Sequence, residues 1–358
     1  MTINAQTSVV LPEVEKSFAR LVNHVSEHGI ECDAISDSKV QFNHEGCSLE
    51  FSHDSQQLQI KLNAPTENML YFLQEAAAAH VMEIDPVAGE TLTWAGTSVV
   101  STQTGTPTNF FELKLIQKRE ILSGIMRLTF SVDNLCDLPR DGLHVKLMCP
   151  KFKSVSPKWP SVARNGMTVW PDGKNELHVR YFTIRSIRLA AGEIDIDVVQ
   201  HKGGMISDWA YAAKNGELVG IMGPAGGGVP VVNGEVLLVG DETALPAIAR
   251  ILEELPPLQK GNVVAPASDL QELHSYFPKT NLQYHSIERG RFRGECEGFV
   301  KALYTQDLTP TYAWFGGEFS NANSMRKIFK NNFGLTKGNQ LSVSYWELGK
   351  RGAANLIE

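Results

Sequence analysis

The sequence contains few cysteines, and no two of them have CxxC spacing. There are five in 358 residues, and they are Cys32, Cys47, Cys136, Cys149 and Cys296. Iron–sulfur clusters and structural zinc sites need clustered thiolates, so neither is predicted. An odd number of scattered cysteines is typical of reduced thiols in a reducing compartment. We expect them to serve as small buried apolar residues.

Long apolar runs and an excess of positive charge are also missing. No run approaches the roughly 18–20 apolar residues that a membrane-spanning helix needs. The N-terminus lacks the basic start and apolar core of a signal peptide, so we expect a cytoplasmic protein with no membrane partner. The net charge of −7 argues against general nucleic-acid binding, because phosphate contacts need a basic face. The length predicts two or three globular domains.

Residues 1–91 predict a small α+β accessory domain. Apolar residues recur with a helical period over residues 12–28 and again over 67–84. Between these helices, short alternating segments separated by turn signals predict three strands, at 40–42, 48–51 and 58–62. Residues 92–109 are mostly polar and have no helical period, which is typical of a linker.

The rest of the chain predicts two further domains, the first made mainly of strands and the second of alternating strands and helices. Residues 110–232 predict an antiparallel β-barrel with one helix near 205–213. Its strands are expected at 112–118, 125–131, 143–148, 178–185, 194–199 and 217–222. Residues 233–358 alternate strands with helices, and several strands are apolar throughout. This pattern predicts a doubly wound parallel sheet with both faces covered. Its strands are expected at 235–239, 262–265, 282–285, 312–315 and 341–345, with helices at 245–254 and 324–331.

The segment RYFTIR, residues 180–185, has a composition suited to a flavin. In a regular strand Arg180 and Phe182 share one face, while Thr183 and Arg185 share the other. A guanidinium suits a pyrophosphate, an aromatic ring suits the isoalloxazine, and a hydroxyl can reach the flavin where the strand bends or ends. Taken alone, this segment is also explained by an ordinary cross-strand ladder with exposed arginines, which is the simpler interpretation.

A glycine-rich turn then precedes the predicted barrel helix. His201, Lys202 and Gly204 lead into Ser207 and Trp209. Backbone N–H groups at a helix start, with a serine hydroxyl, form an anion site suited to phosphate. The alternative is that Ser207 is simply an N-cap residue. The later turn GPAGGG, which contains Gly223 and Gly226, would allow a ligand or the next domain to come close.

In this order the three motifs resemble those of the siderophore-interacting proteins, within the ferredoxin-reductase-like flavoprotein superfamily. The family pattern R-x-Y-T-x-R, then H…G-x-x-S-x-W-A, then G-P-x-G, is similar to residues 180–185, 201–210 and 223–226. Phe182 stands where the family usually has tyrosine, so stacking is retained and a phenol hydrogen bond is lost. The resemblance implies that FAD binds these residues.

The resemblance continues into the last domain. Residues 240–248, GDETALPAI, resemble the family's strand–turn–helix segment and include Asp241, Thr243 and Ala244. Residues 314–318, WFGGE, resemble its W-x-A-G-E, with Gly317 and Glu318 expected at a nicotinamide site. Residues 345–349 resemble its C-terminal Y-W-x-x-G, where Trp346 would shield the flavin or pack the last strand. Arg326 and Lys327 either face a 2′-phosphate or form a solvated helix face.

The family resemblance implies a reductase that passes electrons from NADPH or NADH through FAD to a ferric siderophore. No protein side chain need act as an obligatory acid, base or nucleophile. Reduction to Fe²⁺ would weaken the grip of hard oxygen ligands and release the metal. An anionic, catecholate-type chelate would need a basic pocket, for which the candidates are Lys146, Lys202, Lys350 and Arg351. A ferredoxin is an alternative electron donor.

Two other functions remain open from the sequence. One is a general flavin or quinone diaphorase, and the other is a non-catalytic flavoprotein that binds an iron chelate. Half of the ten histidines lie in the N-terminal region, at His24, His28, His44, His53 and His80. Their spacing matches no metal-ligand motif, so no metal site is predicted.

Overall fold

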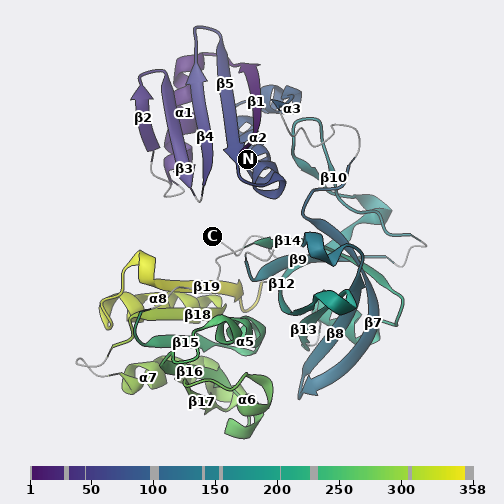
Figure 1. Ribbon diagram of the computed structural model, residues 1–358, viewed down its shortest axis with the longest axis vertical. Coiled ribbons are helices and arrows are strands. Elements are labelled where there is room, and N and C mark those ends of the chain that lie inside the picture. Colours follow the sequence, from purple (N-terminus) through teal and green to yellow (C-terminus); the bar gives the residue numbers. More distant parts are fainter. Residues whose placement is uncertain are drawn as a thin grey trace. The chain divides into compact units, whose positions relative to one another are not determined.

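The computed structural model describes residues 2–27, 32–44, 46–96, 105–138, 142–152, 156–201, 203–225, 233–304 and 309–350. The chain forms two compact units (Figure 1). The first comprises Met1–Phe110 and Ser154–Glu176, and the second Phe111–Lys153 and Leu177–Glu358. Lys202, Gly226 and Arg351 lie outside the described residues. Within the described part of the chain, none of the helices combines the length and the apolar character needed to cross a membrane.

The first unit is built on a six-stranded sheet in the order β2-β3-β4-β5-β1-β6. Helices α1 (Val14–Glu27) and α2 (Glu67–Ile84) lie on one face of this sheet (Figure 1). The strands are β1 (Ile3–Val10), β2 (Cys32–Ser36), β3 (Lys39–His44), β4 (Cys47–His53), β5 (Gln57–Ala64) and β6 (Ala95–Gly96). The α+β prediction is confirmed. Sequence reasoning missed β1, which pairs with β5 along its whole length.

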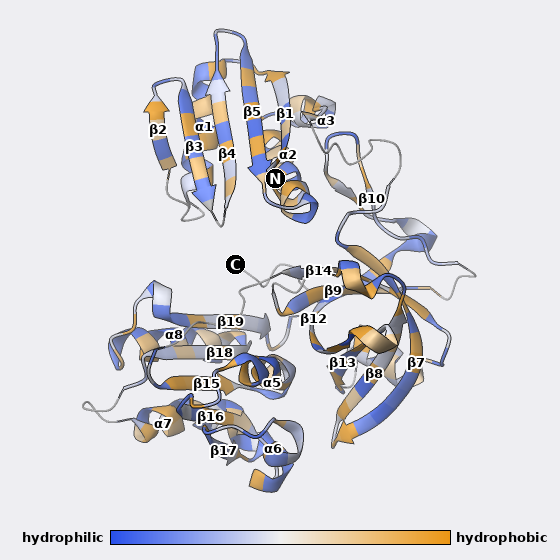
Figure 2. Ribbon diagram, in the orientation of Figure 1, coloured by the Kyte–Doolittle hydropathy of each residue, from blue (hydrophilic) through white to orange (hydrophobic). Residues whose placement is uncertain are grey.

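Alternating hydropathy explains how this sheet covers its core. Figure 2 shows hydrophobic and hydrophilic residues alternating along β5. Its inward residues Leu58, Ile60 and Leu62 are fully buried and belong to the same core as Leu21 of α1 and Leu70 of α2. Because successive side chains of a strand point to opposite faces, one face of the sheet binds the helices and the other stays polar.

A segment from within the predicted barrel region packs with the first unit. Its short strands β10 (Ser161–Val162) and β11 (Thr168–Val169) form a hairpin. The indole of Trp94 donates a hydrogen bond of 2.7 Å to the carbonyl of Asn165, whose amide donates one of 3.0 Å to the carbonyl of Gly89. Trp94 lies in the predicted linker but is 6% exposed. Its buried indole needs this partner, which ties the two segments together.

The predicted barrel is confirmed as a closed six-stranded antiparallel structure in the order β12-β13-β8-β7-β14-β9. The strands are β7 (Phe110–Leu122), β8 (Ile125–Val132), β9 (His144–Pro150), β12 (Leu177–Arg188), β13 (Glu193–Val199) and β14 (Leu218–Ala225). Helix α4 (Met205–Ala212) contributes Ile206 and Ala210 to the barrel core.

The predicted parallel sheet is also confirmed, with strand order β17-β16-β15-β18-β19. The strands are β15 (Val236–Gly240), β16 (Gly261–Pro266), β17 (Gln283–Ile287), β18 (Tyr312–Glu318) and β19 (Gln340–Trp346). The helices are α5 (Leu245–Glu254), α6 (Leu270–Tyr276), α7 (Arg289–Leu303) and α8 (Phe319–Asn331). Sequence reasoning missed α6 and α7.

Both faces of the parallel sheet are buried, which explains its apolar strands. Val236 and Leu238 of β15 pack with α5 and α6, while Leu237 and Val239 pack with α7 and α8. Figure 2 shows the resulting nearly continuous hydrophobic colour along β15. The strand order reverses direction between β15 and β18, because β16 and β17 extend to one side and β18 and β19 to the other. In such folds ligands bind at this reversal, beyond the carboxyl ends of the strands.

A buried polar cluster joins the barrel to the parallel-sheet domain. Arg127 of β8 donates two hydrogen bonds of 2.7 Å to the carboxylate of Asp197 on β13. The hydroxyl of Tyr276, at the end of α6, donates a third of 2.6 Å. Burial and the neighbouring carboxylate hold the pKa of Tyr276 well above its ordinary value, so its proton stays in place.

We expect Asp197→Asn to lower the free energy of unfolding of the second unit by about 3–5 kcal/mol, because it leaves the Arg127 guanidinium without its charge partner. Tyr276→Phe removes one hydrogen bond to a charged acceptor and should cost roughly 1.5–3 kcal/mol. Denaturant unfolding measures both changes. Tyr211→Phe is the matched control, because Tyr211 is 69% exposed. Equal effects of the two Tyr→Phe changes would contradict this account of the cluster.

Candidate functional site

Strand β12 carries a half-buried cation beside an aromatic ring. Arg180 pairs with Leu147 of β9, and Phe182 pairs with Val145. The Arg180 guanidinium donates a 2.5 Å hydrogen bond to the carbonyl of Val179, its only hydrogen-bond partner among the described residues. Desolvation lowers the pKa of Arg180. A partly buried guanidinium with no carboxylate partner in this part of the structure fits an anionic group such as a pyrophosphate.

Arg185 is placed differently from Arg180. The β12–β13 register shifts between Ile184 and Ser186, so Arg185 lies at a bulge. Its Nη1 donates a 2.8 Å hydrogen bond to Glu253 Oε1 of α5, and its guanidinium lies 5.5 Å from the ring centre of Tyr276. Arg185 is 8% exposed, and its Nε has no hydrogen-bond partner among the described residues. Arg185 therefore joins the barrel to the sheet domain and keeps one buried donor available.

The turn before α4 is held closed by its own side chains. The backbone N–H of His201 donates a 2.9 Å hydrogen bond to Ser207 Oγ. Gly204 is the N-cap residue, so the alternative interpretation of Ser207 as N-cap is wrong. A Cβ on Gly204 would lie 2.1 Å from the His201 ring, so any side chain there would have to displace that ring. Trp209 donates a 3.0 Å hydrogen bond to Glu217 Oε2.

The first backbone N–H groups of α4 are suited to binding an anion. The first N–H groups of a helix have no intrahelical acceptor, and here a glycine, rather than a capping side chain, precedes them. Farther along the barrel, Gly223 in β14 has φ 126°, a backbone conformation that favours glycine. The neighbouring Gly226 cannot be placed with it, since it lies outside the described residues.

Asp241 organises the carboxyl edge of the parallel sheet. Its Oδ1 accepts hydrogen bonds from the Thr243 N–H at 2.9 Å and from the Thr243 hydroxyl at 2.5 Å. Its Oδ2 accepts a 2.8 Å hydrogen bond from the indole of Trp346, at the end of β19. Burial raises the pKa of Asp241, although these bonds oppose the shift. Ala244, next in the turn, is fully buried beneath Gly240.

Glu318, at the end of β18, lies across the reversal from Asp241. Its Oε2 accepts hydrogen bonds from the N–H groups of Ser320 at 2.7 Å and Asn321 at 3.3 Å, which makes Glu318 the N-cap of α8. Burial alone would raise its pKa, but these bonds prevail and lower it. Gly317 has φ 153°, and a Cβ there would lie 2.6 Å from Asp241 Oδ2. Glycine at this position therefore lets the backbone at the end of β18 come close to the Asp241 carboxylate.

A cavity of about 210 Å³ lies at this edge of the sheet. Its lining residues come from the ends of β15, β18 and β19 and from the starts of α7 and α8: Asp241, Glu242, Arg289, Gly290, Phe292, Arg293, Glu318, Asn321 and Trp346. Arg289 and Arg293 bring positive charge into the cavity. Neither arginine was expected from the sequence, because α7 was not predicted.

The other predicted cations have local partners. Arg326 Nη2 donates a 2.9 Å hydrogen bond to the carbonyl of Ser342, which ties α8 to β19. Lys350 forms a 2.9 Å ion pair with Glu347, and its side chain is 69% exposed. Lys146, on β9, pairs in register with Tyr181, and its ammonium lies 5.8 Å from that ring centre. Its role in substrate binding stays a prediction.

A buried histidine that sequence reasoning missed connects the two halves of the second unit. His144 Nδ1 lies 3.2 Å from Thr183 Oγ1 on β12, and its Nε2 lies 3.1 Å from the hydroxyl of Tyr345 on β19. Desolvation, with the positive charge of Arg250, lowers the pKa of His144 to about 4. The imidazole is therefore neutral near pH 7. It fixes the Thr183 hydroxyl of the predicted flavin strand against the last strand of the sheet.

Two protein families match the part of the chain that contains these residues. Residues 114–228 match the siderophore-interacting FAD-binding domain, and residues 234–349 match the siderophore-interacting protein family. The chain belongs to the siderophore-interacting protein family. The FAD-binding match includes β12, the turn before α4 and His144, while the second match includes the cavity. Most of the first unit lies outside both matches.

Relatives and solved structures agree with this assignment. The chain is 26% identical over 250 residues to ferric vibriobactin reductase ViuB of Vibrio cholerae, covering 68% of this chain and 91% of that protein. It is 44% identical over 186 residues to the uncharacterized protein Rv2895c of Mycobacterium tuberculosis, covering 48% and 66%. The siderophore-interacting protein SipS from Aeromonas hydrophila superposes with a TM-score of 0.56 at 25% identity, covering 68% and 94%.

The residues of the FAD-binding domain fit the cofactor that the family implies. The barrel offers a guanidinium without a carboxylate partner among the described residues, a ring at Phe182 and a glycine-led helix start in one domain. These are the groups that a pyrophosphate and an isoalloxazine need. The individual roles of Arg180, Phe182, Thr183 and Ser207 stay predictions.

The buried neutral state of His144 predicts a pH dependence of stability. Its pKa is about 4 in the folded protein, below its ordinary value of 6.5, so the unfolded chain binds more protons between these pH values. This contribution to stability is present above pH 6.5 and is lost as the pH falls toward 4. The free energy of unfolding should therefore fall between pH 7.5 and pH 5.0. We expect this fall to be about 2 kcal/mol larger in the native protein than in the His144→Gln variant.

The measurement is denaturant unfolding of both proteins, followed by the fluorescence of released flavin so that it reports on the second unit. His274→Gln is the control, because His274 lies outside the barrel, on α6. A loss between pH 7.5 and 5.0 that is identical in the native protein and His144→Gln would contradict the assignment of a neutral buried imidazole.

Proposed function

We propose that this protein is an FAD-dependent reductase that passes electrons from a nicotinamide dinucleotide to a ferric siderophore and so releases Fe²⁺ in the cytoplasm. The observation that carries the proposal is the pairing, within one compact unit, of an FAD-binding barrel with a cavity at the strand reversal of a parallel sheet. A protein that only bound iron chelates would have no use for the second site. The names of ViuB and of the ferric acinetobactin reductase of Acinetobacter baumannii, 23% identical over 175 residues, favour a ferric siderophore as acceptor.

In the barrel, the chain's own residues would position the cofactor. Arg180 would neutralise a pyrophosphate charge, and the start of α4 would hold a second phosphate oxygen with backbone N–H groups. Phe182 would support the ring system, and His144 would hold the Thr183 hydroxyl in one orientation. Bound FAD would supply the link between a two-electron donor and a one-electron ferric acceptor.

At the edge of the sheet, the cavity would receive the nicotinamide dinucleotide. Arg289, anchored by an ion pair with Glu272, and Arg293 would bind its phosphates. Gly317 would act indirectly, because the space of its missing side chain is taken by the Asp241 carboxylate that lines the cavity. Trp346, held by Asp241, would close the cavity toward β19. A ferredoxin donor would not need this cavity, so the cavity favours a nicotinamide donor.

The acceptor would be bound through its negative charge. A catecholate siderophore grips Fe³⁺ with hard oxygen ligands and carries net negative charge, while Fe²⁺ prefers softer ligands. Of the two described candidates for this contact, Lys146 and Lys350, we favour Lys146, which lies on the strand that pairs with both β12 and β14. We place the reaction in the cytoplasm because reduced nicotinamide nucleotides are available there.

The test of the function is a visible spectrum of the purified protein under anaerobic conditions. We expect flavin absorbance at ~450 nm that is bleached by NADPH or NADH and returns on adding a ferric catecholate siderophore, with Fe²⁺ captured by a ferrous chelator. A colourless protein that cannot be loaded with FAD would refute the proposal. Bleaching by a nicotinamide without oxidation by any ferric chelate would indicate a diaphorase, and reduction by a ferredoxin alone would exclude the nicotinamide donor.

The nucleotide cavity predicts a specific effect of Arg293→Ala. Removing this lining guanidinium should raise the KM for NADPH about tenfold, equivalent to about 1.4 kcal/mol, and leave kcat nearly unchanged, because the contact is with a non-reacting phosphate. Arg291→Ala is the matched control, because Arg291 lies on the same helix, pairs with Glu295 at 2.5 Å and does not line the cavity. Steady-state kinetics that change equally in both variants would exclude the cavity as the dinucleotide site.

A further inference from the structure

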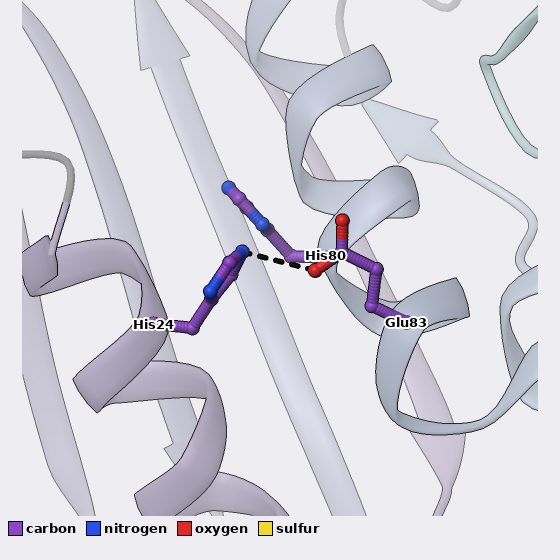
Figure 3. A group of neighbouring side chains, drawn as sticks. All are labelled: His24, His80 and Glu83. Carbon is purple, nitrogen blue, oxygen red and sulfur yellow. Dashed lines mark ion pairs between the residues drawn. The ribbon is translucent and has the colours of Figure 1, made fainter.

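Folding brings together three potential metal ligands in the first unit that are far apart in the sequence. His24 lies in the last turn of α1, and His80 and Glu83 lie three residues apart on α2. Residues at this spacing share one face of a helix. Figure 3 shows His24 reaching from α1 toward the two side chains of α2. The sequence offered no ligand motif because the set is divided between two helices separated by four strands.

The geometry of the three side chains suits one metal ion. One ligand atom from each residue lies within 4.8 Å of the other two. His24 Nε2 and Glu83 Oε2 are 2.9 Å apart, and the rings of His24 and His80 lie 4.9 Å apart at 78° (Figure 3). Neighbouring ligands of a metal bound at about 2.0–2.2 Å are separated by roughly 3 Å, so small rotations of His80 would complete the set.

We propose that His24, His80 and Glu83 bind one divalent transition-metal ion of the Fe²⁺ or Zn²⁺ class. Two imidazoles and one carboxylate form a ligand set of intermediate softness, which suits these ions better than Mg²⁺ or Ca²⁺, whose ligands are oxygens. Three protein ligands leave coordination positions for water or an exchanging ligand. The side chains of His24 and Glu83 are 37% and 61% exposed, so an ion can enter and leave from solvent.

The position of the cluster in the chain indicates which ion the site would bind in the cell. It lies outside residues 114–349, the span of the two family matches, in a unit to which the reductase chemistry assigns no role. The identity of the ion in the cell rests on the function proposed above. It is the Fe²⁺ that the reductase releases, and the first unit binds that product. The metal site itself does not depend on that function, because any divalent ion of this class can test it.

The competing explanation is that the cluster only joins two helices. The His24–Glu83 ion pair connects α1 to α2, and the helices also share a hydrophobic core. A purely structural cluster requires no metal, and the edge contact between the rings of His24 and His80 would then serve packing alone. The two explanations therefore differ in their metal stoichiometry and in the effect of changing His80.

The experiment titrates the full chain, stripped of metal with a chelator, with Co²⁺ as a spectroscopic probe. We expect one Co²⁺ per chain with visible absorption bands, displaced by Zn²⁺ and, under anaerobic conditions, by Fe²⁺. His24→Gln, His80→Gln and Glu83→Gln should each weaken binding at least about tenfold, the size of loss seen when even the residues around metal ligands are disturbed. Binding should also weaken at lower pH, because metal ligands must be deprotonated.

His53→Gln is the matched control, because His53 lies in the same unit on β4 and contacts Phe18 rather than the cluster. Unchanged circular dichroism of each variant verifies that the unit is folded. No stoichiometric Co²⁺ or Zn²⁺ binding, or binding that His80→Gln leaves intact, would overturn the site. Zn²⁺ binding without Fe²⁺ binding would support the site and overturn its link to the reductase. The flavin spectrum is a separate readout, so failure of the reductase and failure of the metal site are distinguishable.

Discussion

The buried carboxylate of Asp197 is the interaction on which the arrangement of the second unit depends. It accepts two hydrogen bonds from Arg127 within the barrel and one from Tyr276 at the end of α6. A carboxylate buried this deeply is tolerated only because all three bonds compensate for its desolvation. The same contact fixes the barrel against the parallel sheet. Arg185, on the strand β12 that is predicted to bind the flavin, reaches Glu253 of α5 and strengthens that connection.

A second constraint operates at the carboxyl edge of the parallel sheet, where the backbone of β18 at Gly317 lies too close to Asp241 to carry a side chain. Asp241 and Glu318 flank the strand reversal, and Gly317 between them cannot carry a side chain without meeting Asp241. The two carboxylates are occupied by helix caps, by Thr243 and by Trp346. Their oxygens are thus already engaged within the fold, and the cavity lining combines these carboxylates and Glu242 with Arg289 and Arg293 of α7.

Much of this architecture could be predicted from particular sequence patterns. The helix at residues 67–84 has a threonine N-cap and a buried face that is apolar except for Gln74, and its boundaries agree with the structure. The apolar run of β15 predicted a strand buried on both faces, because such strands have no polar side. The missed elements had weak signals. β1 has inward residues that include Thr7, and α7 begins with alternating arginines and glycines that conceal its apolar stripe.

The sequence by itself determined most of the secondary structure, the family and the segment predicted to bind the flavin, because these depend on local periodicity and on contiguous motifs. Only the tertiary structure placed His144 between Thr183 and Tyr345, since that contact depends on strand register and on the packing of two domains. It likewise brought His24 to His80 and Glu83. Proximity between residues distant in the chain is set by which faces bury together, and no local pattern in the sequence records it.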